Sequence, residues 1–228
     1  MCHPILKRIL CLVFALAMFV FIITASIGLP IYIRPFYYAH IEAMDLPGYS
    51  GFSQAQIRQA YDQVLDYLTI PGKDFGTGEL AYSPEGKAHF EDCKALFDLN
   101  AVALLISGIC LVVLLALRRK CGPYRLGKRS AAFYGSLAAI VIPVVVGGLA
   151  ATNFDRAFVI FHSLFFPGKD NWIFDYRTDQ IILVLPQDFF MHCAILIGAG
   201  ILGMSLAVLI GEWIVALRHK HKEAVHSA

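Results

Sequence analysis

The chain has 228 residues, of which 58% are hydrophobic and only 16% are charged. Soluble domains carry about a quarter charged residues, and the apolar residues here gather in long runs, so the composition excludes an ordinary soluble protein. The net charge of +2 does not indicate a nucleic-acid partner, because the basic residues gather beside the apolar runs.

Four apolar runs approach or exceed the roughly 20 residues that cross a bilayer as a helix. They cover residues 9–33, 101–117, 131–151 and 191–217. The first follows Lys7 and Arg8, as in a signal peptide, but it is longer than the roughly 15 apolar residues of such a signal. We therefore predict an uncleaved anchor and an all-α membrane protein with four transmembrane helices.

The charges between the runs predict the orientation. Residues 118–130 contain six basic residues and no acid, and residues 218–228 are also basic, as is typical of cytoplasmic segments. Residues 34–100 contain five basic and ten acidic residues, and residues 152–190 contain three and five. These two segments are therefore predicted to lie outside, with both termini in the cytoplasm.

The first outer segment predicts two helices. Residues 53–69 begin with a serine suited to an N-cap, have Gln56 at the capping-box position, and place apolar residues on one face. Ser83 and Pro84 suit the start of a second helix, which would carry His89 and continue into the next apolar run.

The second outer segment predicts an interfacial helix followed by two strands. Residues 155–166 carry an aromatic stripe at helical spacing. Residues 172–176 and 181–185 are rich in β-branched and aromatic side chains around a polar turn, which favours short strands. Both outer segments together are predicted to form a small extracellular cap of helices and short strands.

The usual motifs of nucleotide, serine and zinc enzymes do not explain this chain. Gly198–Gly203 matches the letters of a dinucleotide-binding loop but lies inside an apolar run, where small residues favour close helix packing. The sequence contains no G-x-S-x-G, H-E-x-x-H or C-x-x-C. An enzyme of this sequence is therefore not expected to attack with its own serine or cysteine.

Two histidines of the outer segments are the candidates for acid–base chemistry. His89 and Asp92 form an i, i+3 pair, in which a carboxylate can orient an imidazole, although such pairs are also common on solvated helices. His162 lies among phenylalanines, which equally suit an aromatic belt at a membrane surface. His89, Asp92 and His162 would also suit a zinc ion with one open position, but their spacing is a weak signal.

Two outer stretches carry a resemblance to a known family. Gly86–Phe97 contains His89, Phe90, Asp92, Lys94 and a final Leu-Phe, and Phe161–Phe190 contains Phe-His, Trp-x-Phe and Leu-Pro-x-x-Phe-Phe. With four spans, they resemble the lipoprotein intramolecular transacylases of low-GC Gram-positive bacteria. Cys93 departs from the aliphatic residue expected there.

The resemblance implies an enzyme of a bacterial plasma membrane whose partners are a diacylated lipoprotein and membrane lipid. It would move the sn-2 acyl chain to the amine of the lipoprotein's own N-terminal cysteine, without cofactor or metal. It assigns catalysis to His89 and His162; we expect His89 to be the base, oriented by Asp92, although the roles can be reversed. The other expected supporting residues are Tyr61, Trp172 and Asp179, and the expected substrate pocket is formed by Phe158, Phe161, Phe165 and Phe174.

Three other functions remain open from the sequence. They are a non-catalytic four-span sensor or interaction protein, a zinc-dependent membrane hydrolase, and an acyltransferase that acts between two molecules. The sequence predicts neither the oligomeric state nor whether Cys93 and Cys193 interact.

Overall fold

The structure is a computed structural model that describes the fold of residues 3–226, without the side chains of residues 142, 146, 149–151 and 219–226. Helices make up 77% of it. The chain divides into two compact units. Unit 1 contains the N-terminal segment up to Ser26, Val102–Gly148 and the segment from Gly198 onward, and unit 2 contains Ile27–Ala101 and Leu149–Ile197.

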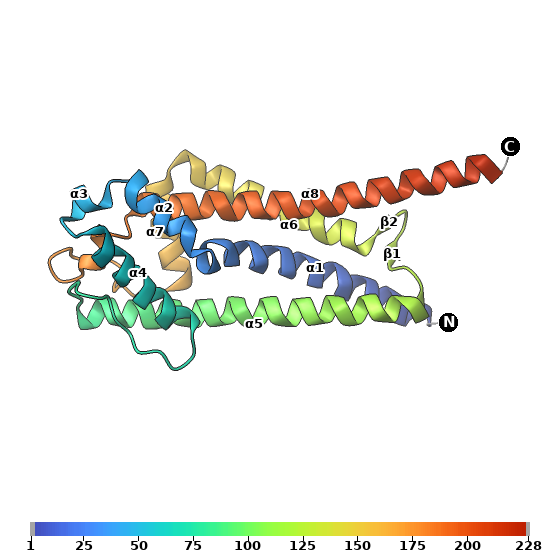
Figure 1. Ribbon diagram of the computed structural model, residues 1–228. Coiled ribbons are helices and arrows are strands. Elements are labelled where there is room, and N and C mark those ends of the chain that lie inside the picture. Colours follow the sequence, from blue (N-terminus) through green and yellow to red (C-terminus); the bar gives the residue numbers. More distant parts are fainter. Residues whose placement is uncertain (1–2, 227–228) are drawn as a thin grey trace. The chain divides into compact units, whose positions relative to one another are not determined.

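Among the described residues, three helices are long and apolar enough to cross a membrane. They are α1 (Pro4–Tyr32), α5 (Pro84–Cys121) and the Gln187–Arg218 part of α8 (Gln187–His226). The remaining predicted span forms α6 (Ala131–Thr152), in which Ala131–Val145 is the apolar part that is described. The four predicted runs thus all form helix (Figure 1).

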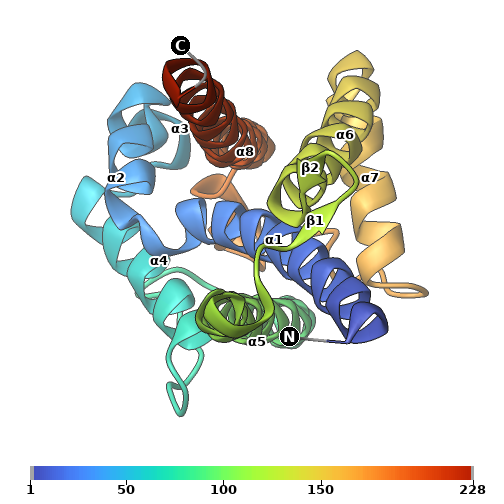
Figure 2. The ribbon, with the colours of Figure 1, turned by 90° about the vertical axis from the view of Figure 1, so that its right-hand side faces the viewer.

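In unit 1, the basic segment between the second and third apolar runs contains a hairpin that was not predicted. β1 (Arg125–Leu126) pairs with antiparallel β2 (Arg129–Ser130) around Gly127, whose positive φ of 65° favours glycine. The hairpin lies beside α1 (Figure 2), where the Cys11 thiol is 3.7 Å from the Arg125 carbonyl oxygen.

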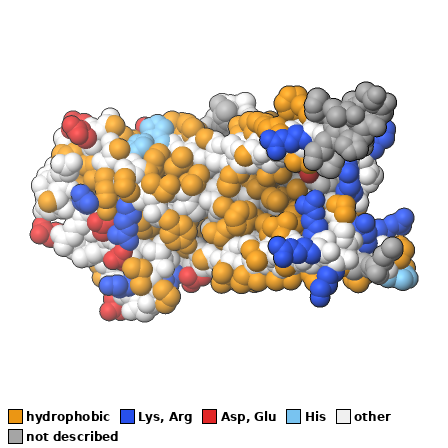
Figure 3. Space-filling model, turned by 45° about the vertical axis from the view of Figure 1, so that its right-hand side comes forward, with side chains coloured by type: hydrophobic (Ala, Val, Ile, Leu, Met, Phe, Trp, Pro, Cys, Tyr) orange, Lys and Arg blue, Asp and Glu red, His pale blue; other side chains and the backbone are white. Residues whose placement is uncertain are grey.

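Close helix packing in unit 1 occurs at Gly135 of α6. A methyl group added there would overlap the Ala15 carbonyl of α1, whereas one added at Gly198 or Gly203 would meet no described atom within 4 Å. On the face shown in Figure 3, hydrophobic side chains cover a broad area.

Unit 2 contains the shorter helices. They are α2 (Arg34–Ala43), α3 (Leu46–Ser50), α4 (Gln54–Thr69), α7 (Phe154–Phe165) and the 3-10 turn η1 (Gln180–Leu183). The prediction for α4 is confirmed. Ser53 accepts from the Gln56 backbone N–H, the Gln56 side chain accepts from the Ser53 backbone, and the predicted apolar face is buried.

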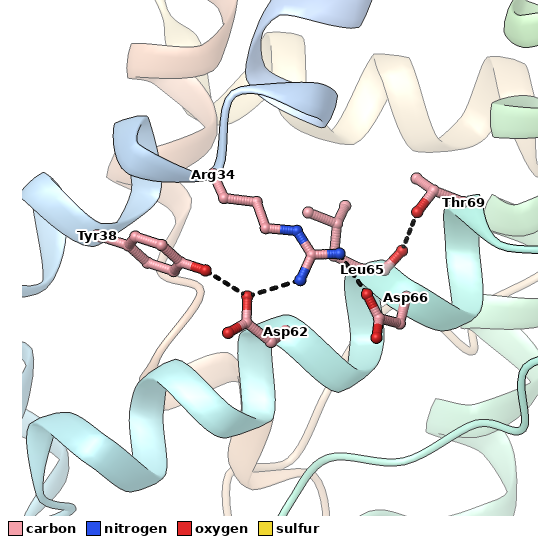
Figure 4. A network of polar contacts seen from close by, with 6 residues as sticks. All are labelled: Arg34, Tyr38, Asp62, Leu65, Asp66 and Thr69. Atoms are coloured by element: carbon pink, nitrogen blue, oxygen red, sulfur yellow. Dashed lines mark hydrogen bonds and ion pairs between the residues drawn. The ribbon is translucent and has the colours of Figure 1, made fainter.

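The core of unit 2 joins α2, α4 and η1. The ring of Tyr37 is fully buried and stacks on Tyr61, with centroids 3.8 Å apart, and its hydroxyl donates to the Val184 carbonyl oxygen at 2.7 Å. At the edge of this core, Figure 4 shows Arg34 of α2 paired with Asp62 and Asp66 of α4. These contacts hold the start of α2 against α4.

The two strands predicted over residues 172–176 and 181–185 are wrong. The first segment forms turns, and the second forms η1 and the residues that follow it. Their backbone N–H groups bond locally: Asp179 donates to the Asp175 carbonyl at 2.7 Å, and Leu185 donates to that of Ile181 at 2.9 Å. Such local bonds replace those that a neighbouring strand would have supplied.

Candidate active site

The start of α5 positions His89 within unit 2. Asp179, only 4% exposed, accepts hydrogen bonds from the Ser83 backbone N–H (2.8 Å) and hydroxyl, and that hydroxyl accepts from the Gly86 N–H at 2.9 Å. A methyl group on Gly86 would overlap the Asp179 carboxylate. Asp179 therefore supports the helix that carries His89, and its carboxylate also accepts from the Thr178 hydroxyl at 2.9 Å.

His89 is 7% exposed and is enclosed by aromatic side chains. Phe166 and Phe174 lie edge-on to its ring, with centroids at 4.9 and 5.5 Å. Its Nε2 is 3.4 Å from the Cys93 sulfur. Burial, followed by the nearby His162, lowers the pKa of His89 to about 4, so the imidazole is neutral at pH 7.

The structure gives Asp92 partners other than those predicted. Its carboxylate forms an ion pair with Lys169 and accepts from the Asn171 side-chain amide at 3.1 Å. These partners hold the pKa of Asp92 below its usual value even though burial opposes the shift. Its described hydrogen bonds thus go to the segment after α7, and not to His89.

His162 lies on α7 with its ring orientation fixed by the helix backbone. Its Nδ1 is 2.8 Å from the Phe158 carbonyl oxygen, which can only accept, so Nδ1 carries the proton and Nε2 carries the lone pair. Trp172 stacks on the ring, with centroids 4.4 Å apart and planes inclined by 25°. Burial lowers the pKa of His162, with the Phe158 hydrogen bond opposing the shift.

The two histidines meet although they come from different outer segments. Their ring centroids are 5.8 Å apart, their planes are inclined by 32°, and Phe166 lies close to both rings. The structure thus places two neutral imidazoles side by side in an aromatic environment. Two neighbouring neutral imidazoles can accept and donate protons at one reacting group of a bound substrate.

The other predicted site residues divide into two groups. Phe158 lies 4.3 Å from His162 between ring centroids, and Phe174 lies beside His89. Phe161 is 48% exposed but also lies edge-on to His162, with ring centroids 5.4 Å apart. By contrast, Phe165 is 46% exposed and packs on Phe161, and Tyr61 lies in the core of unit 2 against Tyr37.

Sequence reasoning missed three residues that contact the site. Phe166 packs on both histidines, while Lys169 and Asn171 bind Asp92. All three lie in or beside the turn after α7, which contains Pro167 and Gly168. Trp172, which follows this turn, was predicted as a supporting residue, and it indicates that the turn lies near the histidines.

The thiol at Cys93 is not suited to nucleophilic attack, because burial raises its pKa to about 12 and keeps it protonated. Cys93 and Cys193 are both free thiols. Among the described residues, no group of three or more His, Cys, Asp and Glu side chains is arranged to hold a metal ion.

One protein-family model matches most of the chain. The model of the family described as "Lipoprotein intramolecular transacylase Lit" matches residues 12–190, well over half of the chain. The chain belongs to this family. It is therefore a lipoprotein transacylase, a transferase, and a multi-pass protein of the plasma membrane.

Solved structures of one relative extend the match to nearly the whole chain. The membrane-integral lipoprotein intramolecular transacylase of Bacillus cereus is 27% identical, with a TM-score of 0.85, over 96% of this chain and 100% of the other. Two variants of that protein, with a histidine replaced by arginine or alanine, are 26% identical with TM-scores of 0.79. They match over 95% of this chain and 95% and 96% of theirs. A comparison with curated protein sequences gives no match.

Proposed function

We propose that this enzyme moves the acyl chain from the sn-2 oxygen of a diacylglyceryl-modified lipoprotein to the α-amine of the same lipoprotein's N-terminal cysteine. The product is a lyso-form lipoprotein, and His89 and His162 are the catalytic residues. The observation that carries this proposal is the pair of neutral imidazoles 5.8 Å apart in an aromatic environment. The family supplies the reaction class, and the geometry supplies the groups that move protons.

The attacking nitrogen and the ester belong to one substrate molecule, so the protein need not supply a nucleophile. Attack closes a ring of about eight atoms, and holding its two ends together removes much of the entropic barrier. The aromatic side chains of Phe158, Phe166, Phe174 and Trp172 around the histidines suit the apolar glyceryl and acyl groups. The protonated thiol of Cys93 agrees with this division of roles.

The proton balance explains why two neutral imidazoles are needed. The substrate ammonium gives one proton to Nε2 of His162, and the resulting amine attacks the sn-2 carbonyl carbon. Nε2 of His89 takes a second proton from the nitrogen as the amide forms. The C–O bond breaks and the leaving sn-2 oxygen receives the proton from His162. One proton remains on the amide nitrogen, one is on the new hydroxyl, and His89 releases the third to solvent.

We further propose that the site faces the outside of the cell, with both termini cytoplasmic. The proposed membrane spans are residues 9–33, 101–117, 131–151 and 191–217. Residues 34–100 and 152–190 form the extracellular cap, and residues 118–130 and 218–228 are cytoplasmic. The support is the excess of Lys and Arg in the last two segments and of Asp and Glu in the cap segments.

Mass spectrometry of one diacylated lipoprotein, incubated in detergent with the pure enzyme and no other lipid, tests the reaction. The intact mass is expected to stay unchanged, while the N-terminal peptide gains an amide-linked acyl chain and a lyso-glyceryl group. His89→Ala and His162→Ala are each expected to abolish the product. A gain in mass would indicate an outside acyl donor, and loss of one acyl chain would indicate a hydrolase.

A further inference from the structure

Two polar atoms beside the catalytic pair are buried without a regular hydrogen bond in the described structure. They are Nδ1 of His89 and the side-chain oxygen of Asn171. Phe166 and Phe174, which flank Asn171 in the chain, both pack on the His89 ring. Asn171 also binds Asp92, which lies one helical turn after His89. The same short segment therefore brings the Asn171 amide to the face of α5 that carries His89.

The orientation of the Asn171 amide follows from its partner. The Asp92 carboxylate is ionised and can only accept, so it takes the amide NH₂ at 3.1 Å. The amide oxygen is then left as an acceptor that needs a donor. The ion pair of Lys169 with Asp92 holds this carboxylate in place from the same segment.

The other nitrogen of His89 has a partner that fits this arrangement. Nε2 lies 3.4 Å from the Cys93 sulfur, and the thiol keeps its proton because burial raises its pKa to about 12. A protonated thiol is a weak donor, and it can donate to Nε2 only when that nitrogen carries the lone pair. The remaining proton of the neutral ring then lies on Nδ1, the nitrogen that is buried without a regular hydrogen bond in the described structure.

We propose that Asn171 is a positioning residue, whose side-chain oxygen accepts the Nδ1 proton of His89 and thereby keeps the Nε2 lone pair free for the substrate. Asn171 acts through His89, while Asp92 and Lys169 act through Asn171. This inference rests on the proposed function only for the role of Nε2 as a base. A buried amide in this position fixes one tautomer of a catalytic histidine, as carboxylates and carbonyls do in other sites.

The titratable and charged groups that face His89 set the expected shifts in its pKa. His162 and Lys169 lower it, whereas Asp92 and the Asn171 side chain raise it. Removing the amide in Asn171→Ala is therefore expected to lower the pKa of His89 further. Asn171→Asp keeps an acceptor and adds negative charge, so it is expected to raise the pKa.

Imidazole ¹⁵N–¹H NMR of the full chain in detergent tests the proposal, with the His89 signals assigned by their loss in His89→Phe. In the unmodified protein the proton is expected on Nδ1. In Asn171→Ala the tautomers are expected to mix, with kcat lowered about 10- to 100-fold and KM little changed. Asn171→Asp should keep the proton on Nδ1 and provides a second variant if the alanine variant does not fold.

Asn153→Ala is the matched control, because Asn153 caps α7 by accepting from the Arg156 N–H at 2.9 Å. It should lower thermal stability and leave the His89 tautomer and pKa unchanged. An unchanged His89 tautomer and pKa in Asn171→Ala, or the same change in Asn153→Ala, would overturn the proposal. Lack of transacylation by the unmodified protein would overturn only the proposed function, since the tautomer is measured without substrate.

Discussion

The indole of Trp172 lies stacked on the imidazole of His162, with ring centroids 4.4 Å apart. Its Nε1 donates to the Lys169 carbonyl oxygen at 3.1 Å, so the indole is held by the same turn whose side chains bind Asp92. One segment thus fixes the ring plane of His162 and the surroundings of His89 together.

Replacing Trp172 is expected to slow the reaction without removing the histidine pair. Trp172→Ala loses a stacked contact, for which aromatic pairs contribute about 1 kcal/mol beyond their buried area, so we expect a fall of about fivefold in kcat. Trp172→Phe keeps an aromatic face and should retain most of the activity. Equal loss in both variants would indicate that the indole N–H, and not the stack, is what matters.

Both histidines are expected to become protonated only below pH 6.5. Burial disfavours their charged forms, so the pKa of each is lowered and protonation moves to lower pH. An NMR titration of the imidazole C–H signals should give a midpoint of about 4 for His89 and one below 6.5 for His162. A midpoint at or above 6.5 for either histidine would contradict the neutral pair.

The pKa of His89 also predicts a change of stability with pH. The pKa of His89 is lower in the folded state than in the unfolded chain. The stability that comes from burying the neutral imidazole is therefore complete above about pH 6.5, and it is lost as the pH falls toward 4. His89→Phe cannot take up this proton. The fall in Tm between pH 6.5 and 4 should therefore be smaller in His89→Phe than in the unmodified protein, and an equal fall would count against burial of a neutral imidazole.

Cys93 is expected to modulate His89 without taking part in bond formation. Cys93→Val removes the weak thiol hydrogen bond to Nε2 and should keep the transacylation rate within a few-fold. Cys93→Ser offers a stronger hydroxyl donor to Nε2, which the substrate must displace, so its rate should be several-fold lower. Loss of activity in Cys93→Val as complete as in His89→Ala would instead show that the thiol is required for the chemistry.

Gly86 is expected to be essential for the start of α5. In Gly86→Ala the added methyl group would overlap the Asp179 carboxylate and disturb its bonds to Ser83, which should lower the free energy of unfolding by about 2 kcal/mol. Gly203→Ala, in a helix with nothing near the added methyl group, is the control and should leave Tm unchanged or slightly raised. Equal Tm values for the two variants would refute the close contact with Asp179.

Local sequence signals predicted the helices well because their causes are local. The capping box of Ser53 and Gln56 and the spacing of apolar residues in α4 lie within one segment. The strands expected after residue 172 do not form because the backbone there bonds locally, while the Asp179 side chain binds Ser83 across 96 residues, a contact that periodicity does not encode. In the same way, the motifs predict both histidines as candidates, whereas the contact of Asn171 with α5 depends on how the turn after α7 folds back onto that helix.

The central claim is that the acyl chain moves within one lipoprotein molecule, and a crossover experiment tests it most directly. Two diacylated lipopeptides, one with isotopically heavy acyl chains and a heavy peptide and one with light chains and a light peptide, would be mixed with the enzyme. We expect amide-linked heavy chains only on heavy peptides and light chains only on light peptides. Heavy chains on light peptides would show transfer between molecules and contradict the account.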